Sequence, residues 1–346
     1  MKKFIFIFSL VLLTGCAIFH KEKKKQIYIE SISQQLPPSP EEEAFVEEKK
    51  DFVQQDVIKK KKIKEKKEIS MKEESTKVET QIAPPPLTTS PTLKEKKDFS
   101  IWNGECLIYK AEWTNMDVGK GMIVCQEENT KYGIVYHLIG ITLPEGLPAK
   151  LGQGYNRIDS YVDKETFQPY YFYSYIKNGN ITRIIEAEFN KGRKEFEWQT
   201  KKYRAGELYQ SKNGKLSYKD CIYDSFSVFY ILRTLNFEEK SEFTIPVGIT
   251  KIWDLFIKVK GKRKENIPGL GIKEIYEIEP EAKSDEGFFT KGKMIIWVTS
   301  DEKKLPVYFL GKMALGTGKM TLISNIKLKP DVKLTRETIA KILSSI

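Results

Sequence analysis

Histidine is nearly absent from this chain of 346 residues, which contains two. His20 lies in a Lys-rich N-terminal stretch, so His137 is the one histidine among the aromatic segments that follow residue 100. A zinc site made of several histidines is therefore excluded, and a Ser-His-Asp triad would have to use His137. His137 stands within the strand-like run IVYHLIGI, which is typical of a histidine satisfied in or on a sheet. The sequence predicts no metal site and no cofactor.

Long apolar runs are missing as well. The stretch from Phe4 to Leu13 follows Lys2 and Lys3 and is too short to span a bilayer, a pattern typical of an export signal. It ends in LTGC (13–16), which resembles the bacterial lipobox. That resemblance implies lipid transfer to the Cys16 thiol, cleavage before it, and acylation of the new amino terminus by fatty acids such as palmitate. The alternative is an ordinary secretory signal in which the cysteine has no role.

The residue after the cysteine is Ala17. In lipoproteins that resemble this one, Asp at that position favours retention in the inner membrane, so Ala17 predicts the periplasmic face of the outer membrane. The inner membrane and the cell surface stay open as alternatives. The formal net charge of +11 would suggest nucleic acid as a partner, but export argues against it. The expected partners are the membrane, through lipid on Cys16, and a lipid or another envelope protein as ligand.

Tryptophan is absent from residues 20–98, and all five tryptophans follow residue 100. The N-terminal region is rich in Lys, Glu and Pro, and so little apolar surface cannot offset the entropy lost on folding. The sequence therefore divides into a signal peptide (1–15), a disordered tether (16–99) and a β-rich globular domain (100–346). As a coil, the tether would span roughly 50 Å and hold the domain away from the membrane.

Short runs of β-branched and aromatic residues fill residues 100–328, separated by turn residues such as KNGN (177–180). Such short links favour antiparallel neighbours. The predicted fold is mainly β: a strongly curved antiparallel sheet or incomplete barrel packed on one buried helix. A short amphipathic helix capped by Thr335 is expected at the C-terminus.

The run DSFSVFYILR predicts the buried helix, over residues 224–235. Asp224 suits the N-cap, where it would accept from the backbone N–H of Phe226 or Ser227. Tyr230 and its neighbours make the helix apolar nearly all round, which is typical of burial. Arg233 is expected to pair with a carboxylate or with strand carbonyls. A catalytic Ser227 is the alternative, but no G-x-S-x-G turn surrounds it.

Three cysteines remain in the predicted domain. If the first hairpin turns at Asn115 and Met116, Cys106 and Cys125 face each other, and an exported protein could form a disulfide there. A slip of register would remove it. Cys221 is expected to be a buried thiol.

Pairs of glutamates at i, i+2 spacing, such as Glu195 and Glu197, lie on one face of a strand. They could serve glycoside hydrolysis, although the solvated face of a sheet has the same pattern. Tyrosines with the same spacing could line a cleft or simply pack; they are Tyr155, Tyr171, Tyr173 and Tyr175.

Three segments together resemble a family of exported bacterial proteins that carry the domain of unknown function 3108. They are GECLIYKAEW…VGKGMIV (104–124), the helix with Asp224, Ser227, Tyr230, Leu232 and Arg233, and IWVTSDEKKLPVYF (296–309). They occur in the family's order and span residues 104 to about 326. The family implies a location in the envelope and no established activity. The last segment is also similar to one in periplasmic lipoprotein carriers, whose half-barrel wraps apolar ligands.

Together these observations favour a lipid-anchored module of the cell envelope that binds or scaffolds, with a lipid or other apolar molecule as one ligand. The alternative is an envelope hydrolase that uses a carboxylate pair or His137.

Overall fold

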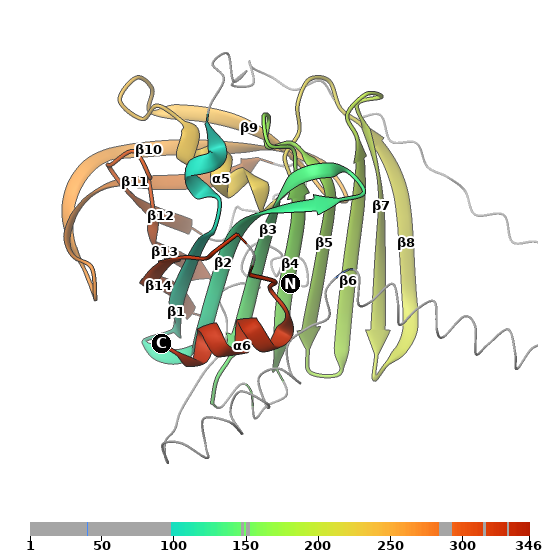
Figure 1. Ribbon diagram of the computed structural model, residues 1–346, viewed down its shortest axis with the longest axis horizontal. Coiled ribbons are helices and arrows are strands. Elements are labelled where there is room, and N and C mark those ends of the chain that lie inside the picture. The colour runs from blue at the N-terminus through green and yellow to red at the C-terminus, as the bar shows by residue number, and fades with distance from the viewer. Residues whose placement is uncertain are drawn as a thin grey trace, which may run out of the picture.

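The computed structural model describes residues 98–146, 153–283, 293–313, 316–330 and 332–346, together with the isolated residues 40 and 149. The predicted signal peptide, Cys16 and nearly all of the predicted tether lie outside these residues. The described part forms one antiparallel sheet of fourteen strands, with a short 3-10 helix and two α-helices (Figure 1).

The first eight strands follow the 3-10 helix η1 (Phe99–Trp102). They are β1 (Glu105–Trp113), β2 (Met116–Thr130), β3 (Gly133–Pro144), β4 (Gln153–Val162), β5 (Pro169–Asn178), β6 (Ile181–Asn190), β7 (Glu195–Arg204) and β8 (Glu207–Ser217). The remaining elements are α5 (Ser227–Thr234), β9 (Glu242–Gly248), β10 (Ile252–Ile267), β11 (Gly271–Lys283), β12 (Lys293–Thr299), β13 (Pro306–Met313), β14 (Gly316–Lys327) and α6 (Arg336–Ser344).

Tight hairpins set the up-and-down order, as the turn residues predict. β5 and β6 are joined through two residues, with Asn178 opposite Ile181 and Gly179 at φ +59°. A positive φ in a two-residue hairpin matches the right-handed twist of the strands it joins, which is why glycine and asparagine recur there.

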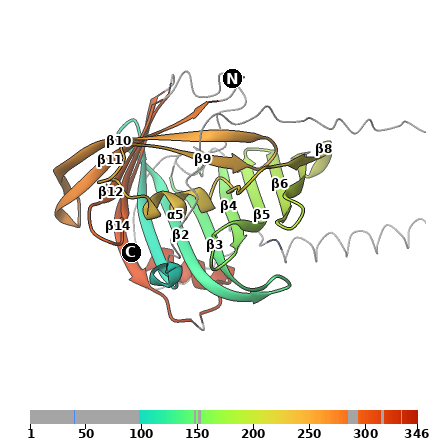
Figure 2. The same cartoon turned by 90° about the horizontal axis from the view of Figure 1, so that it is seen from above.

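The strand order is cyclic with one break. Each strand pairs with its neighbours in the chain, and β1 pairs with β14, so the two edges of the sheet are β8 and β9. The segment between these edges carries α5 into the curve of the sheet, which Figure 2 shows from above. A parallel bridge between Tyr223 and Val247 ties this segment to β9. The prediction of a curved, incompletely closed antiparallel sheet around a buried helix is confirmed.

Side chains fill the inside of the curve. Trp102, Phe167 and Tyr230 meet with ring centroids 5.3–5.6 Å apart, and all three are at most 3% exposed. They belong to one apolar cluster that joins η1, α5 and both halves of the sheet. The helix therefore acts as a core element rather than a surface feature.

The C-terminal helix α6 covers part of the outer face. Thr335 caps it by accepting from the N–H of Thr338, as predicted. Ile339 and Leu343 pack onto the outward side chains of β1, β2 and β3, in a cluster separate from the interior one.

The prediction that Cys106 and Cys125 face each other is wrong. The first hairpin turns at Thr114 and Asn115, and β1 and β2 then pass a bulge, so Cys106 lies opposite Val124. Cys125 points into the interior cluster while Cys106 lies on the outer side of the sheet. Both thiols are free and buried, and a displacement of one residue separates them because strand side chains alternate between faces.

Candidate functional site

The outer face of β3–β8 carries two rows of mostly polar and aromatic side chains that cross the strands side by side. Cross-strand register places them directly opposite one another. One row runs through His137, Tyr161, Tyr171, Glu188, Glu197 and Lys215. The next runs through Ile139, Asp159, Tyr173, Glu186, Gln199 and Asn213.

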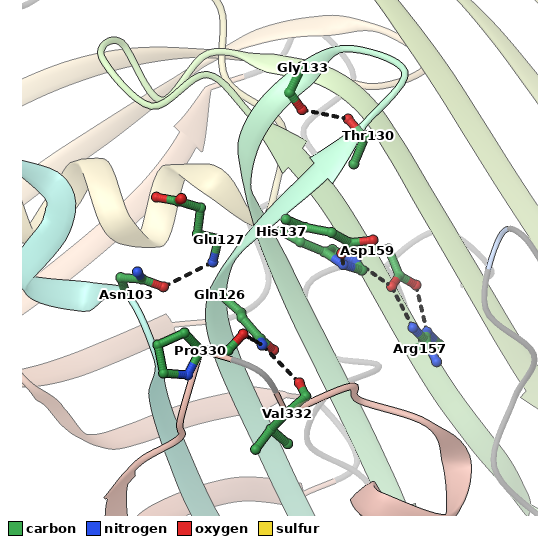
Figure 3. A network of polar contacts seen from close by, with 11 residues as sticks. Asn103, Gln126, Glu127, Thr130, Gly133, His137, Arg157, Asp159, Pro330 and Val332 are labelled. Atoms are coloured by element: carbon green, nitrogen blue, oxygen red, sulfur yellow. Dashed lines mark hydrogen bonds and ion pairs between the residues drawn. The ribbon is translucent and has the colours of Figure 1, made fainter.

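His137 lies at one end of the first row, between two carboxylates. Its Nδ1 is 2.5 Å from Glu128 Oε2, and its Nε2 is 2.8 Å from Asp159 Oδ1. Arg157 donates to both oxygens of Asp159, from Nε and from a terminal guanidinium nitrogen, each at 2.7 Å (Figure 3). The His137 ring stacks on Tyr161 at a centroid distance of 4.1 Å. Both ring nitrogens are thus engaged, which leaves neither of them to accept a proton from a substrate.

The electrostatics of this cluster favour its charged form. Burial alone would lower the pKa of His137, but the hydrogen bonds to Asp159 and Glu128 and their charges outweigh it and raise that pKa. Burial would raise the pKa of Asp159, but the Arg157 charge and the hydrogen bonds lower it. Two cations therefore balance two anions, which is the condition under which charges are tolerated away from water. The cluster braces β2, β3 and β4.

The opposite end of the rows forms an open groove of about 450 Å³ over β5–β8. Its polar lining comprises three carboxylates, two amides and one ammonium group: Glu186, Glu188, Glu197, Gln199, Asn213 and Lys215. Tyr171 closes the end nearest His137.

Neighbouring donors orient each carboxylate through one oxygen. The Tyr171 hydroxyl donates to Glu186 Oε1 at 2.8 Å, and the Tyr132 hydroxyl donates to Glu188 Oε1 at 2.9 Å. Burial, followed by the charge of Glu186, raises the pKa of Tyr171, so this phenol stays a hydrogen-bond donor. Lys215 Nζ lies 3.4 Å from Glu197 Oε1. In the part of the chain described here, the second oxygen of each of these three carboxylates receives no hydrogen bond.

The helix motif is structural. Asp224 Oδ1 accepts from the N–H of Phe226 at 2.6 Å and of Ser227 at 2.9 Å, as predicted, and its Oδ2 accepts from the hydroxyl of Ser160 at 2.5 Å. Burial raises the pKa of Asp224. The hydroxyl of Ser227, which is fully buried, accepts from the N–H of Asp224. These reciprocal bonds close the turn that precedes α5 and leave no exposed nucleophile. The N-cap of the helix is Phe226 rather than the predicted Asp224.

Arg233 confirms the expectation of a carboxylate and carbonyl partner. Its two terminal nitrogens donate to the two oxygens of Glu105 at 2.6 and 2.7 Å, and its guanidinium also donates to the carbonyl of Lys303. The guanidinium lies over the rings of Trp102 and Tyr230 at 4.8 and 5.3 Å. Arg233 thus connects α5 to the start of β1 and to the turn before β13.

The crevice between α5 and the β9–β12 side is small. It holds about 30 Å³, close to the volume of one water molecule, and is lined by apolar side chains such as Phe229, Trp253 and Met294. Of the four tyrosines predicted to line a cleft, Tyr171 lines the outer groove, whereas Tyr173 is 1% exposed.

The structure also locates the paired glutamates that the sequence singled out. Glu197 lies in the groove, while Glu195 pairs with Arg193 and Lys215 at 2.6 and 2.7 Å. Gln199 and Asn213 were missed as site residues, because only the β7–β8 register shows that they face each other. The described residues gather no group of three or more His, Cys, Asp or Glu side chains that could hold a metal ion. None of the described helices is long and apolar enough to cross a bilayer.

Comparison with known proteins gives a matching family, and solved structures match the chain as well. The model of the family described as "Protein of unknown function (DUF3108)" matches residues 108–323, more than half of the 346 residues. No curated protein matches the chain. A crystal structure of a β-barrel-like protein of domain of unknown function DUF1849 from Brucella abortus is 7% identical, with a TM-score of 0.39. That similarity covers 65% of this chain and 98% of the other.

Proposed function

The chain belongs to the DUF3108 family, and from that premise we propose that it is a lipid-anchored cell-envelope module that binds a polar ligand on the outer face of its sheet. The observation that carries this proposal is the contrast between the two faces. Inside the curve, α5 and the aromatic side chains leave a crevice of about 30 Å³, whereas the outer face holds an open groove of about 450 Å³. Small-molecule sites occupy roughly 300–1,000 Å³, a range that the outer groove reaches and the crevice beside α5 does not.

The same contrast argues against an apolar cargo. An acyl chain held as in the lipoprotein carriers would need the space that Phe229, Trp253 and their neighbours fill. The hydrolase alternative is less well supported, because both nitrogens of His137 are engaged and tyrosine hydroxyls hold the carboxylates of Glu186 and Glu188. A polar ligand, bound without chemical change, fits this arrangement best.

The anchor is supported by the sequence pattern that ends at Cys16. Acylation there, with Ala17 next to it, would place the domain at the periplasmic face of the outer membrane. Two or more acyl chains give lasting attachment, whereas one chain gives marginal binding.

Two measurements test the proposal. Mass spectrometry of the N-terminal peptide from fractionated envelopes should show acyl groups on Cys16 and should place the peptide in the outer-membrane fraction; an unmodified, soluble chain would contradict the anchor. Titration of the purified chain with a fluorescent fatty acid should show no saturable binding. Saturable binding at one site, competed by unlabelled fatty acid, would contradict a filled interior.

A further inference from the structure

The groove over β5–β8 presents hydrogen-bonding groups that the fold itself leaves partly unused. We propose that it binds a glycan that carries no acidic groups, either neutral or amino-bearing. This deepens the proposed function, since it names the class of ligand for the outer face.

The first argument is the amide pair. Gln199 and Asn213 lie directly opposite each other on β7 and β8, and both line the groove. Among the described residues, neither side-chain amide takes part in a hydrogen bond. Each amide offers both a donor and an acceptor, and the pair presents these groups side by side. Vicinal hydroxyls of a sugar, which also both donate and accept, match such a pair.

The second argument is the set of oriented carboxylates. Glu186 and Glu188 are each held through Oε1 by a tyrosine hydroxyl, which leaves Oε2 to accept from a ligand. Glu188 and Glu197 are directly opposite each other on neighbouring strands. Like charges in this position repel each other, and one cation lies beside each carboxylate: Lys131 at 3.2 Å from Glu188 and Lys215 at 3.4 Å from Glu197. A ligand rich in O–H or N–H donors would bridge the two carboxylates.

The third argument is charge. The three carboxylates of the groove stand against the one ammonium group of Lys215, a balance of −2. Outside the groove, Lys131 reaches Glu188 at 3.2 Å, which brings the balance to −1. Phosphorylated or carboxylated polymers would therefore be repelled, while hydroxyl and amino groups would be accepted. The openness of the groove at the surface suits a chain that continues beyond the bound units.

The test uses the full chain, purified in mild detergent, with a fixed panel of probes. The panel contains linear tetramers of glucose, galactose and N-acetylglucosamine, the deacetylated glucosamine tetramer, polygalacturonate and an oligolysine peptide. Titration calorimetry should show that at least one neutral or amino tetramer binds saturably, with one molecule bound per chain. It should show no binding of polygalacturonate.

A double variant, Gln199→Ala with Asn213→Ala, removes the amide pair and should weaken that binding about tenfold or more. Ser211→Ala is the matched control, because Ser211 lies on β8, opposite Lys201, outside the residues that line the groove. It should leave affinity unchanged. Circular dichroism and melting curves equal to those of the parent chain establish that both variants fold.

Four outcomes would overturn the inference: no binding to any tetramer, binding to polygalacturonate alone, binding to oligolysine alone, or equal loss in the Ser211→Ala control. An acylated, envelope-located chain that binds no glycan refutes this inference and leaves the anchor standing. A chain that lacks acyl groups and still binds a tetramer refutes the anchor and leaves this inference standing.

Discussion

The buried ion pair between Glu105 and Arg233 allows a quantitative test of how the helix is held in the sheet. Its side chains are 8% and 2% exposed, and its two parallel hydrogen bonds measure 2.6 and 2.7 Å. In the variant Glu105→Gln the shape is kept but the carboxylate charge is lost. The guanidinium then stays buried without a counter-charge, because its other partners are a carbonyl and aromatic rings.

Removing one member of a buried pair costs about 3–5 kcal/mol, and Glu105→Gln should fall near 3 kcal/mol since the amide still accepts one bond. Total stability of a domain is roughly 5–15 kcal/mol, so the loss is large. At about 2–4 °C for each kcal/mol in a domain of this size, the melting temperature should fall by about 6–12 °C. Urea unfolding followed by near-UV circular dichroism measures the same loss independently.

Two further variants make the result decisive. The double variant Glu105→Leu with Arg233→Met replaces both charges by apolar groups and should recover much of the stability, because no charge is then left buried. Glu242→Gln removes an exposed partner of Lys258, with side chains 71% and 56% exposed, and should leave stability nearly unchanged. A loss below about 1 kcal/mol for Glu105→Gln, or a double variant no more stable than the single one, would refute the reasoning.

Three other predictions follow from the described contacts. The pKa of His137 is raised in the folded protein, so its protonation should contribute stability in full below about pH 6.5, and this contribution should be lost as the pH rises through the folded pKa. Urea unfolding measured from pH 5 to 10 should show this decline. The variant His137→Gln should abolish it. Ser227→Ala should lower stability by about 1 kcal/mol through loss of its bond to Asp224 while leaving ligand binding intact; loss of binding with an intact fold would revive the catalytic reading. The buried thiols of Cys106 and Cys125 should react with an aromatic disulfide reagent only after unfolding, while half-buried Cys221 reacts first; a band shift on a non-reducing gel would contradict free thiols.

The sequence predicts the fold well where local signals decide it. KNGN predicts the β5–β6 turn because a short link with glycine has few alternatives, and the cap of α6 follows from Thr335. Asp224 and Arg233 are also predicted with their kinds of partner. The helix itself is shorter than expected, Ser227–Thr234, since the residues after Asp224 form a turn before the first helical residue.

The register between strands determines which side chains share a face, and local sequence signals do not predict it. A single bulge in the first hairpin moves Cys106 to the opposite face from Cys125. Gly119, at φ +138°, stands at that bulge, but a glycine within a strand does not fix how far the register shifts. The groove has the same origin: Glu186, Gln199 and Asn213 come from three strands and meet only once β6, β7 and β8 are aligned. Paired glutamates suggest a carboxylate site, but the amides that complete it have no local signature.

The cyclic strand order also has a consequence for how the chain assembles in time. In the described part of the chain, fourteen strands in one open sheet make thirteen pairings, of which twelve join consecutive strands and form from nearby residues. The remaining pairing sets Glu105 of β1 opposite Lys327 of β14, so it waits until the last strand is available. Until then β1 presents an open edge that can pair with other chains. We therefore expect this late closure to be the slow step of folding and the stage most prone to aggregation.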